Sequence, residues 1–264
     1  MTMKIAVLGN GFLGKEFARQ GFTVFGRADI NITNPIHTWT YEWEKLKEYD
    51  VIINCIGKSN TRWCEDNNNF NEMMHINANL PQVLSDFCKV NSIKFVHIST
   101  GCLYDQWQQP CKETDFIVAH CKYVISKWVG EIGCDPETDL IIRPRLYFSD
   151  IPDKNNLLCK LKTFNKFIEI PNSVTSTSTI VEAVVELLSC NQVGIFNVAN
   201  DNPVSIYDIA MYLGLKGTPI YKQEELHLTQ NLFLVNNILD ISKLKQFYKP
   251  RDTLEIVKDY FSKI

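Results

Sequence analysis

Short apolar runs that recur at wide intervals are the feature that most constrains how this chain can fold. They cover residues 4–9, 23–26, 51–57, 94–100, 140–148 and 194–200. Runs of this length and apolarity are typical of strands that are buried on both faces of a sheet. Segments of helical period lie between them, and that alternation indicates a parallel sheet with helices on both faces. The sequence therefore predicts an α/β fold built on a doubly wound parallel sheet.

Two of the intervening segments have clear helical patterns. In residues 119–133 the apolar side chains form one stripe of the kind that packs a helix on a core. The stripe consists of Cys121, Val124, Ile125, Trp128, Val129 and Ile132. A second helix is predicted over residues 73–90, with its inward side chains at Ile76, Leu80, Val83, Leu84 and Phe87. Pro81 in that helix cannot donate to the carbonyl of Asn77, so this carbonyl is expected to be free.

The charge balance and the cysteines exclude several classes of protein. The 27 Lys and Arg residues are offset by 30 Asp and Glu residues, so no basic field would attract nucleic acid or an anionic membrane. No apolar stretch approaches the roughly 20 residues that span a bilayer, and the first residues lack the pattern of a signal peptide. The nine cysteines include no C-x-x-C pair, and Cys111, His120 and Cys121 lack the spacing of metal ligands. We therefore expect a cytoplasmic protein with reduced thiols and without a metal site.

A glycine-rich hexapeptide follows the first predicted strand. It has the form G-x-G-x-x-G and consists of Gly9, Asn10, Gly11, Phe12, Leu13 and Gly14, after which a helical pattern begins. In this context the glycines let the backbone approach a pyrophosphate, which then sits on the N-terminus of the helix. The loop therefore predicts a dinucleotide site, and an ordinary glycine turn is the alternative interpretation.

The end of the second predicted strand bears on the choice of dinucleotide. Enzymes that prefer NAD usually place a carboxylate there for the ribose 2′-hydroxyl, whereas this strand ends at Gly26 and Arg27. A guanidinium suits a 2′-phosphate, so we expect NADPH, with NADH as the alternative. Asp29 could be the carboxylate, but it falls beyond the strand, and we place it with Ile30 at the adenine edge. Arg27 could also be an ordinary solvated arginine.

Residues 149–156 are the segment whose composition most resembles a linker between domains. We predict a dinucleotide-binding domain that comprises residues 1–148 and about 171–200. Residues from about 149 to 170, together with 201–264, then form a substrate-binding lobe.

A Tyr-x-x-x-Lys pattern puts a phenol and an ammonium one turn apart on a helix, so that the tyrosine can give a proton to a carbonyl undergoing reduction. Three pairs fit it: Tyr41/Lys45, Tyr123/Lys127 and Tyr212/Lys216. Only Tyr123/Lys127 follows the fourth sheet strand and faces away from the apolar stripe of its helix. In doubly wound sheets ligands bind beyond the carboxyl ends of strands, where Thr100 also lies. Thr100, Tyr123 and Lys127 are therefore predicted to polarise and protonate a carbonyl beside a hydride carrier.

Several motifs, in order along the chain, resemble those of one enzyme family. They are G-x-G-x-x-G at 9–14, N-C-I-G at 54–57, S-T-G-C at 99–102, Y-x-x-S-K-x-x-G-E at 123–131 and R-P-R at 143–145. This order is similar to that of extended short-chain dehydrogenase/reductases of the dTDP-4-dehydrorhamnose reductase type. T-R-W-C-E at 61–65 and the F-N-K…I-P-N-S segment at 164–173 most resemble the nucleotide-rhamnose synthase epimerase/reductases of plants. The chain departs from the family at Lys122, where the plant enzymes have an aromatic residue, and in glycines spaced one residue closer than the usual G-x-x-G.

The resemblance implies a bifunctional enzyme that epimerises C3 and C5 of UDP-4-keto-6-deoxyglucose and reduces its 4-ketone with NADPH to give UDP-L-rhamnose. Thr100, Tyr123 and Lys127 would serve the reduction, and Cys102 and Lys166 would be the acid/base pair of the epimerisation. The 4-ketone acidifies the hydrogens at C3 and C5, and a cysteine beside a cation is a plausible base for them. Without the resemblance, the interpretation of Cys102 is a small core residue, and that of Lys166 is a surface lysine.

The resemblance also implies roles for residues outside these two sets. Cys55, Ile56 and Gly57 would line the cofactor, and Arg145 would face the substrate. Independently of the resemblance, Asn77 at the substrate side could use its free carbonyl to hold a water in a proton relay from Lys127, and a polar helix position near a kink explains this residue nearly as well. A separate 4,6-dehydratase would supply the keto sugar, with no nucleic acid or membrane partner, and the chain could form a homodimer.

Three alternatives stay open. A dTDP-4-dehydrorhamnose reductase without epimerase activity would carry a tyrosine in place of Cys102 and would not need Lys166. A GDP-fucose synthase shares the cysteine but pairs it with a histidine. A non-catalytic NADP-binding regulatory subunit would keep the fold without needing Thr100, Tyr123 and Lys127 together.

Overall fold

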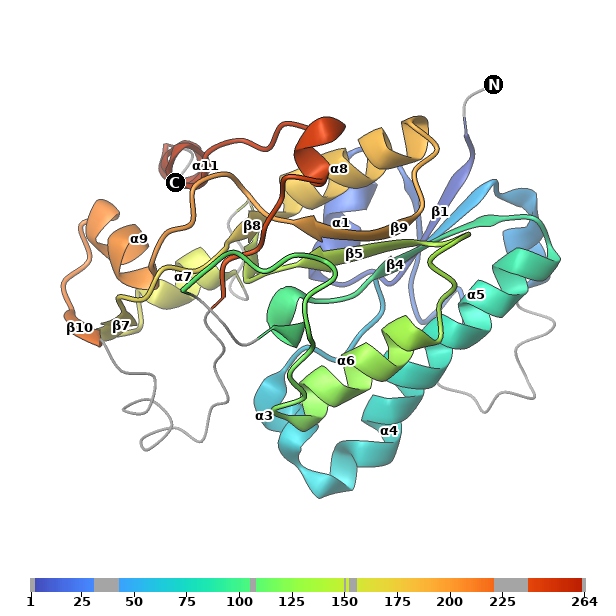
Figure 1. Ribbon diagram of the computed structural model, residues 1–264, viewed down its shortest axis with the longest axis horizontal. Coiled ribbons are helices and arrows are strands. Elements are labelled where there is room, and N and C mark those ends of the chain that lie inside the picture. The colour runs from blue at the N-terminus through green and yellow to red at the C-terminus, as the bar shows by residue number, and fades with distance from the viewer. Residues whose placement is uncertain are drawn as a thin grey trace. The chain divides into compact units, whose positions relative to one another are not determined.

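A six-stranded sheet dominates the computed structural model of the chain, which describes residues 3–30, 43–104, 108–149, 151, 156–220 and 237–262. The strands are β1 (Ile5–Leu8), β2 (Thr23–Phe25), β3 (Val51–Asn54), β4 (Lys94–Ile98), β5 (Leu140–Pro144) and β9 (Gly194–Val198). They lie in the order β2-β1-β3-β4-β5-β9, and successive pairs from β2 to β5 are parallel (Figure 1). The order reverses at β1, which is the switch point of a doubly wound sheet. The predicted fold is confirmed, and each of the six apolar runs contains one of these strands.

The chain forms two compact units. Unit 1 comprises residues 1–99, 122–142 and 192–195, and unit 2 comprises residues 100–121, 143–191 and 196–264. These units are defined by contacts, and the predicted division into a dinucleotide-binding domain and a substrate lobe stays a prediction. Within the residues that the structure describes, every helix is too short or too polar to cross a bilayer.

Unit 1 has helices on both faces of its part of the sheet. The helices and helical turns are α1 (Phe12–Arg19), η2 (Glu44–Glu48), α3 (Thr61–Glu65), η3 (Asn67–Asn69), α4 (Phe70–Met74), η4 (His75–Asn79), α5 (Leu80–Val90) and α6 (Lys122–Ile132). α5 and α6 lie side by side on the face opposite α1 (Figure 1). Buried apolar side chains from the strands and α5 make up the core, with Trp43 and Leu46 packed among them.

The predicted helix over 73–90 forms as part of a longer helical run. Its five predicted inward residues are buried or pack against the core. The turn η4 is π-helical, and it precedes Pro81, which cannot donate the ordinary helical hydrogen bond to the carbonyl of Asn77. The proline therefore changes the local helical repeat without ending the helix.

The apolar stripe predicted for α6 is only partly correct. Cys121 and Val124 are buried, but three of its residues are exposed: Ile125 to 38%, Val129 to 39% and Ile132 to 63%. The side chains on the opposite face are the buried ones, including Lys127 at 4%. The physical reason lies at Gly130, where an added Cβ would lie 2.0 Å from the carbonyl oxygen of Asn77. A helix that approaches η4 this closely must turn its smallest residues, and not its bulky apolar ones, toward that neighbour.

Unit 2 contains two small parallel ladders. β6 (Tyr147–Phe148) pairs with β8 (Thr175–Ser176), and β7 (Lys166–Ile168) pairs with β10 (Thr218–Ile220). Its helices and helical turns are η5 (Gly101–Leu103), α7 (Leu157–Leu161), α8 (Thr177–Ser189), α9 (Ile206–Tyr212), η6 (Leu244–Gln246) and α11 (Thr253–Phe261). Apolar residues of α7, α9 and α11 pack with Phe148 and Phe167 into a separate core. The apolar run 140–148 divides into β5 and β6 because Leu146 has a positive φ of 44° between them.

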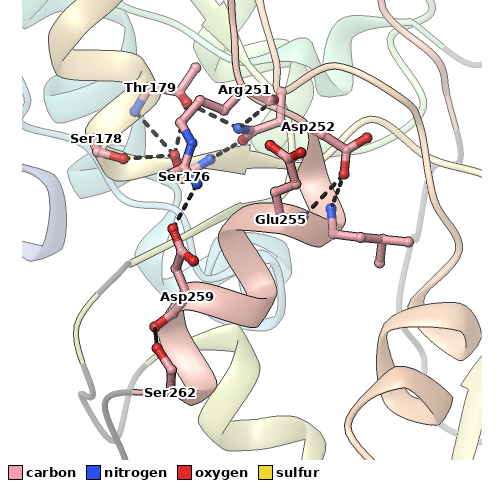
Figure 2. Close-up of polar contacts among 10 residues, drawn as sticks. Ser176, Ser178, Thr179, Arg251, Asp252, Glu255, Asp259 and Ser262 are labelled. Atoms are coloured by element: carbon pink, nitrogen blue, oxygen red, sulfur yellow. Dashed lines mark hydrogen bonds and ion pairs between the residues drawn. The ribbon is translucent and has the colours of Figure 1, made fainter.

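Polar contacts tie the start of α8 to the segment that precedes α11 (Figure 2). Ser176 caps α8 by accepting a hydrogen bond from the backbone of Thr179, and Asp252 caps α11 in the same way. The Asn200 amide donates to Thr179 Oγ1 and to the carbonyl of Arg251, which joins the two caps. Each cap satisfies donors that a helix end leaves free, so the network stabilises unit 2.

Candidate active site

The three glycines of the hexapeptide 9–14 differ in their surroundings. Gly9 has a positive φ of 108°, which forms the sharp turn after β1. A Cβ on Gly14 would lie 1.8 Å from the carbonyl oxygen of Gly9, so this glycine permits the close contact between α1 and the loop. Gly11 is exposed, and a Cβ there would meet no atom within 4 Å. This combination of a tight turn, an open approach and close packing is the one that a pyrophosphate loop requires.

The rest of the hexapeptide divides between exposed and buried positions. Asn10 is exposed beside Gly11, whereas Leu13 is only 5% exposed and belongs to the core. Gly11 is the N-cap residue of α1, and no side chain caps this helix. An anion bound at this turn would face the N-terminal end of α1, which begins at Phe12.

The turn after β2 places Arg27 and Asp29 differently. The Asp29 carboxylate accepts a 2.8 Å hydrogen bond from the backbone N–H of Gly26, and Lys45 donates to the Asp29 carbonyl. Arg27 is exposed at the end of the strand, and Ile30 is buried in the core. The carboxylate is thus used to shape the turn, while the guanidinium faces outward. Tyr41, the partner of Lys45 in the alternative Tyr-x-x-x-Lys pair, lies outside the described residues.

The segment after β3 links the glycine loop to Lys127. A Cβ on Gly9 would lie 2.9 Å from Ile56 Cγ1, and a Cβ on Gly57 would lie 3.9 Å from Lys127 Nζ. Burial raises the pKa of the Cys55 thiol, which therefore stays protonated. Residues 55–57 thus form a continuous strip of unit 1 from the turn at Gly9 to the ammonium of Lys127.

Lys127 is the buried cation of this site. Its Nζ donates a 2.8 Å hydrogen bond to the carbonyl oxygen of Ile98, at the end of β4. Burial lowers its pKa from 10.5 to about 8, and the nearby Glu131 partly opposes that shift. Glu131 is itself buried and accepts a 2.6 Å hydrogen bond from Ser99. Lys127 can therefore gain or lose its proton close to neutral pH.

The first turn of α6 is fixed by the T-R-W-C-E segment. The backbone N–H of Tyr123 donates to Glu65 Oε1 at 3.3 Å, and Lys122 Nζ donates to the Glu65 carbonyl at 2.7 Å. Lys122 also contacts Asn67 Oδ1 at 2.6 Å. Lys122 thus helps to hold the helix that carries Tyr123. Sequence reasoning missed this role of Glu65, although the motif that contains it was recognised.

Asn77 is fully buried, and its side-chain amide bonds to protein groups. Its Oδ1 accepts from the Lys58 N–H at 2.8 Å, and its Nδ2 donates to the Lys58 carbonyl and to Ser126 Oγ, both at 3.0 Å. Its backbone carbonyl lies against Gly130. These contacts connect η4 to the segment after β3 and to α6, and a role of Asn77 toward the substrate stays a prediction.

Cys102 lies in unit 2, in the helical turn η5, and Thr100 is the N-cap residue of that turn. Thr100 Oγ1 accepts a 3.2 Å hydrogen bond from the Cys102 N–H, and Arg145 Nη1 donates to Cys102 Sγ at 3.3 Å. The side chain of Lys166, at the start of β7, is exposed. The contact between Arg145 and Cys102 was not foreseen, because Arg145 was expected only to face the substrate. The assigned roles of Thr100, Cys102, Lys166 and Arg145 stay predictions.

Other candidate groups have structural surroundings. His97 is buried and lies 3.3 Å from Asn54 Nδ2, and His120 contacts the Val118 carbonyl. Tyr212 ends α9, so Lys216 lies beyond the helix and does not share a face with it. All nine cysteines are free thiols.

A curated relative has three activities in its name. It is a trifunctional UDP-glucose 4,6-dehydratase, UDP-4-keto-6-deoxy-D-glucose 3,5-epimerase and UDP-4-keto-L-rhamnose reductase from Arabidopsis thaliana, and it is 24% identical over 264 residues. The match covers 89% of this chain but only 37% of that relative. The chain therefore spans little more than a third of the relative's length.

Two solved structures share the fold along the whole chain. One is the L780 UDP-rhamnose synthase of Acanthamoeba polyphaga mimivirus, with a TM-score of 0.84, 20% identity and 100% of each chain covered. The other is a dTDP-4-dehydrorhamnose reductase from Bacillus anthracis in complex with NADP, with a TM-score of 0.84, 18% identity and 100% of each chain covered. At such identities the likeness concerns the fold alone.

The family itself follows from the sequence match. Residues 3–222 match the model of a family described as the RmlD substrate binding domain, and that stretch contains the glycine loop, Tyr123, Lys127, Cys102 and Lys166. This chain belongs to the RmlD substrate binding domain family.

Proposed function

We propose that this chain is an NADPH-dependent reductase of a nucleotide-linked 4-keto-6-deoxy sugar that also epimerises C3 and C5 of that sugar. Its substrate is UDP-4-keto-6-deoxyglucose and its product is UDP-L-rhamnose. The observation that carries the proposal is the strip of unit 1 from Gly9 through residues 55–57 to Lys127. It joins an open pyrophosphate loop to a buried cation of the type that assists carbonyl reduction.

The residues of the loop fit the cofactor. The exposed Gly11 and the uncapped N-terminus of α1 would hold its pyrophosphate, and the exposed Arg27 would hold a 2′-phosphate. NADPH, when bound, supplies the hydride that reduces the C4 carbonyl. An NADP complex of a protein with this fold supports the same choice.

In the reduction, the phenol of Tyr123 gives its proton to the C4 oxygen while C4 gains the hydride. Lys127 in its charged form stabilises the phenolate that remains, and its hydrogen bond to Ile98 holds it in place. Thr100 donates a hydrogen bond to the same oxygen.

In the epimerisation, the thiolate of Cys102 removes the proton from C3 or C5, and the electron pair of the broken C–H bond moves into an enolate on the C4 oxygen. Thr100 and Tyr123 stabilise that enolate. Lys166 returns a proton to the opposite face of the carbon, and the carbonyl re-forms. The name of the Arabidopsis relative supports this pairing of epimerisation with reduction, and the name of the mimivirus structure supports UDP-rhamnose as the product.

A 4,6-dehydratase must supply the keto sugar, and that activity is in the name of the trifunctional relative. The compartment that we propose is the cytoplasm, where thiols stay reduced, because the nine cysteines include no C-x-x-C pair.

One experiment tests the whole proposal. The protein is given UDP-4-keto-6-deoxyglucose and NADPH in heavy water, and the product is examined by NMR and mass spectrometry. Deuterium at C3 and C5 of UDP-rhamnose is the expected result. A reduced product without deuterium, with the configuration at C3 and C5 unchanged, would leave a reductase that lacks epimerase activity. No turnover of the UDP-linked or dTDP-linked keto sugar would favour a non-catalytic NADP-binding subunit.

A further inference from the structure

The side chain of Arg145 is joined to the thiol of Cys102. Arg145 Nη1 donates a hydrogen bond to Cys102 Sγ at 3.3 Å. Arg145 is only 6% exposed, and Cys102 is half-buried. A hydrogen bond from a charged donor gains strength where water is largely excluded. The contact therefore couples a fixed positive charge to the sulfur.

The backbone of Arg145 is held on both sides of its side chain. Its N–H donates to Thr175 Oγ1 at 3.2 Å, and the Thr175 hydroxyl donates to its carbonyl at 2.8 Å. The next residue, Leu146, has a φ of 44°, in the left-handed region that a leucine rarely adopts. Such a conformation persists only where the surroundings fix it. The backbone of Arg145 is thus held rigidly, and this fixes the position from which the guanidinium reaches the sulfur.

The turn that carries Cys102 is fixed independently. Asn237 Nδ2 donates to the carbonyls of Gly101 at 2.7 Å and of Tyr104 at 2.9 Å. A Cβ on Gly101 would lie 3.2 Å from Arg145 Cβ and 3.0 Å from Leu239 Cδ1. The glycine of the T-G-C motif therefore leaves room for the stem of Arg145 directly against the turn.

We infer that Arg145 is the positioning residue of Cys102: it orients the sulfur and balances the negative charge of the thiolate during proton removal. This role rests on the proposed epimerase function. A guanidinium keeps its protons at all accessible pH values, so it can stabilise the thiolate without returning a proton to it. That leaves Lys166, exposed at the start of β7, to deliver the proton to the opposite face of the carbon.

The test compares Arg145→Gln with Lys166→Gln in three assays on the full chain. The first is the rate at which iodoacetamide alkylates Cys102, followed by mass spectrometry of its peptide. The second is deuterium exchange at C3 and C5, and the third is reduction of UDP-4-keto-L-rhamnose, which is already epimerised. For Arg145→Gln we expect alkylation and exchange to fall about 10- to 100-fold, as loss of a hydrogen bond to a charged group implies, and reduction to fall much less.

The control variants separate charge from structure. Arg145→Lys keeps the charge but not the planar donor, and it should recover part of the alkylation rate. Lys166→Gln should lose exchange and keep the wild-type alkylation rate, since its cation does not act on the sulfur. An Arg145→Gln protein with wild-type alkylation and exchange overturns the role of Arg145. So does a Lys166→Gln protein whose alkylation rate falls as far as that of Arg145→Gln.

Cys102→Ser distinguishes this inference from the function beneath it. Exchange that survives in Cys102→Ser contradicts the proposed epimerase function itself. Exchange that is lost in Cys102→Ser but kept in Arg145→Gln overturns only the role of Arg145. If Arg145→Gln does not fold, Gly101→Ala is used instead. The new Cβ at residue 101 would press on the aliphatic part of the Arg145 side chain, while the guanidinium itself stays in the protein. A Gly101→Ala protein with wild-type alkylation also overturns the role.

Discussion

Lys127 Nζ lies 2.8 Å from the carbonyl oxygen of Ile98, so the buried ammonium is tied to the last residue of β4. Burial lowers the pKa of Lys127 from 10.5 to about 8. In the proposed reduction the charged form assists Tyr123, so the rate should fall as pH rises through about 8. Steady-state NADPH oxidation between neutral and alkaline pH measures this fall.

Lys127→Arg is the control for this pH dependence. An arginine stays charged, so the variant should keep a flat alkaline profile even if its neutral rate is lower. An alkaline fall at the same pH in both proteins would assign it to another group. The lowered pKa of Lys127 also affects stability. Between pH 8 and pH 10.5, about the two pKa values, the unfolded chain binds this proton more tightly than the folded chain does. Lys127 therefore makes the free energy of unfolding rise with pH in that range.

Gly11 and Gly14 should respond differently to alanine. Gly14→Ala puts a Cβ 1.8 Å from the Gly9 carbonyl oxygen, so the fold should lose about 1–3 kcal/mol or more. Gly11→Ala meets no neighbouring atom, so the melting temperature should stay near wild type. The new methyl would nevertheless stand where the pyrophosphate approaches, and NADPH affinity should drop about tenfold or more. Thermal unfolding and NADPH fluorescence titration give both quantities, and wild-type affinity in Gly11→Ala would place the cofactor elsewhere.

Arg27 should set the preference for NADPH over NADH. Arg27→Gln removes the guanidinium from the 2′-phosphate, and the ratio of kcat/KM for the two cofactors should fall about 10- to 100-fold. Asp29→Asn is the matched control, because its side chain shapes the turn through the Gly26 N–H. It should alter stability more than cofactor preference. An unchanged ratio in Arg27→Gln would make that arginine an ordinary surface residue.

Asn77 should be important for stability. Asn77→Leu removes the hydrogen bonds to the Lys58 backbone and to Ser126, which should cost about 2–3 kcal/mol of unfolding free energy. Asn79 in the same turn is exposed, so Asn79→Ala should stay within about 0.5 kcal/mol of wild type. Urea unfolding of both variants checks the difference. Equal stabilities would contradict the structural role of the Asn77 amide.

The strands and the glycine loop could be predicted because their signals are local. Each strand of the sheet lies in a short, mostly apolar run, and the uses of Gly9, Gly11 and Gly14 follow from their spacing beside a strand and a helix. The division of run 140–148 could not be predicted, since it depends on the backbone angle of Leu146, which apolarity does not report.

The contact between Arg145 and Cys102 could not be predicted from the sequence, for a different reason. It joins residues that are 43 positions apart and depends on how Thr175 and Asn237 hold each of them. Periodicity reports which side of an element is apolar, but it does not report which distant side chain a thiol meets. The resemblance to a family placed both residues near the substrate without indicating that they touch.

The reversed burial of α6 has a practical meaning for protein engineering. Transplanted alone into another α/β scaffold, α6 would settle with Ile125, Val129 and Ile132 against the new core, and the ammonium of Lys127 would turn toward water. The close contact between Gly130 and η4 keeps the polar face inside, together with the hydrogen bonds between Lys127 and Ile98 and between Ser99 and Glu131. A graft would therefore need α6 with both the helical run that contains η4 and the end of β4, and the Tyr-x-x-x-Lys pattern is not portable without them.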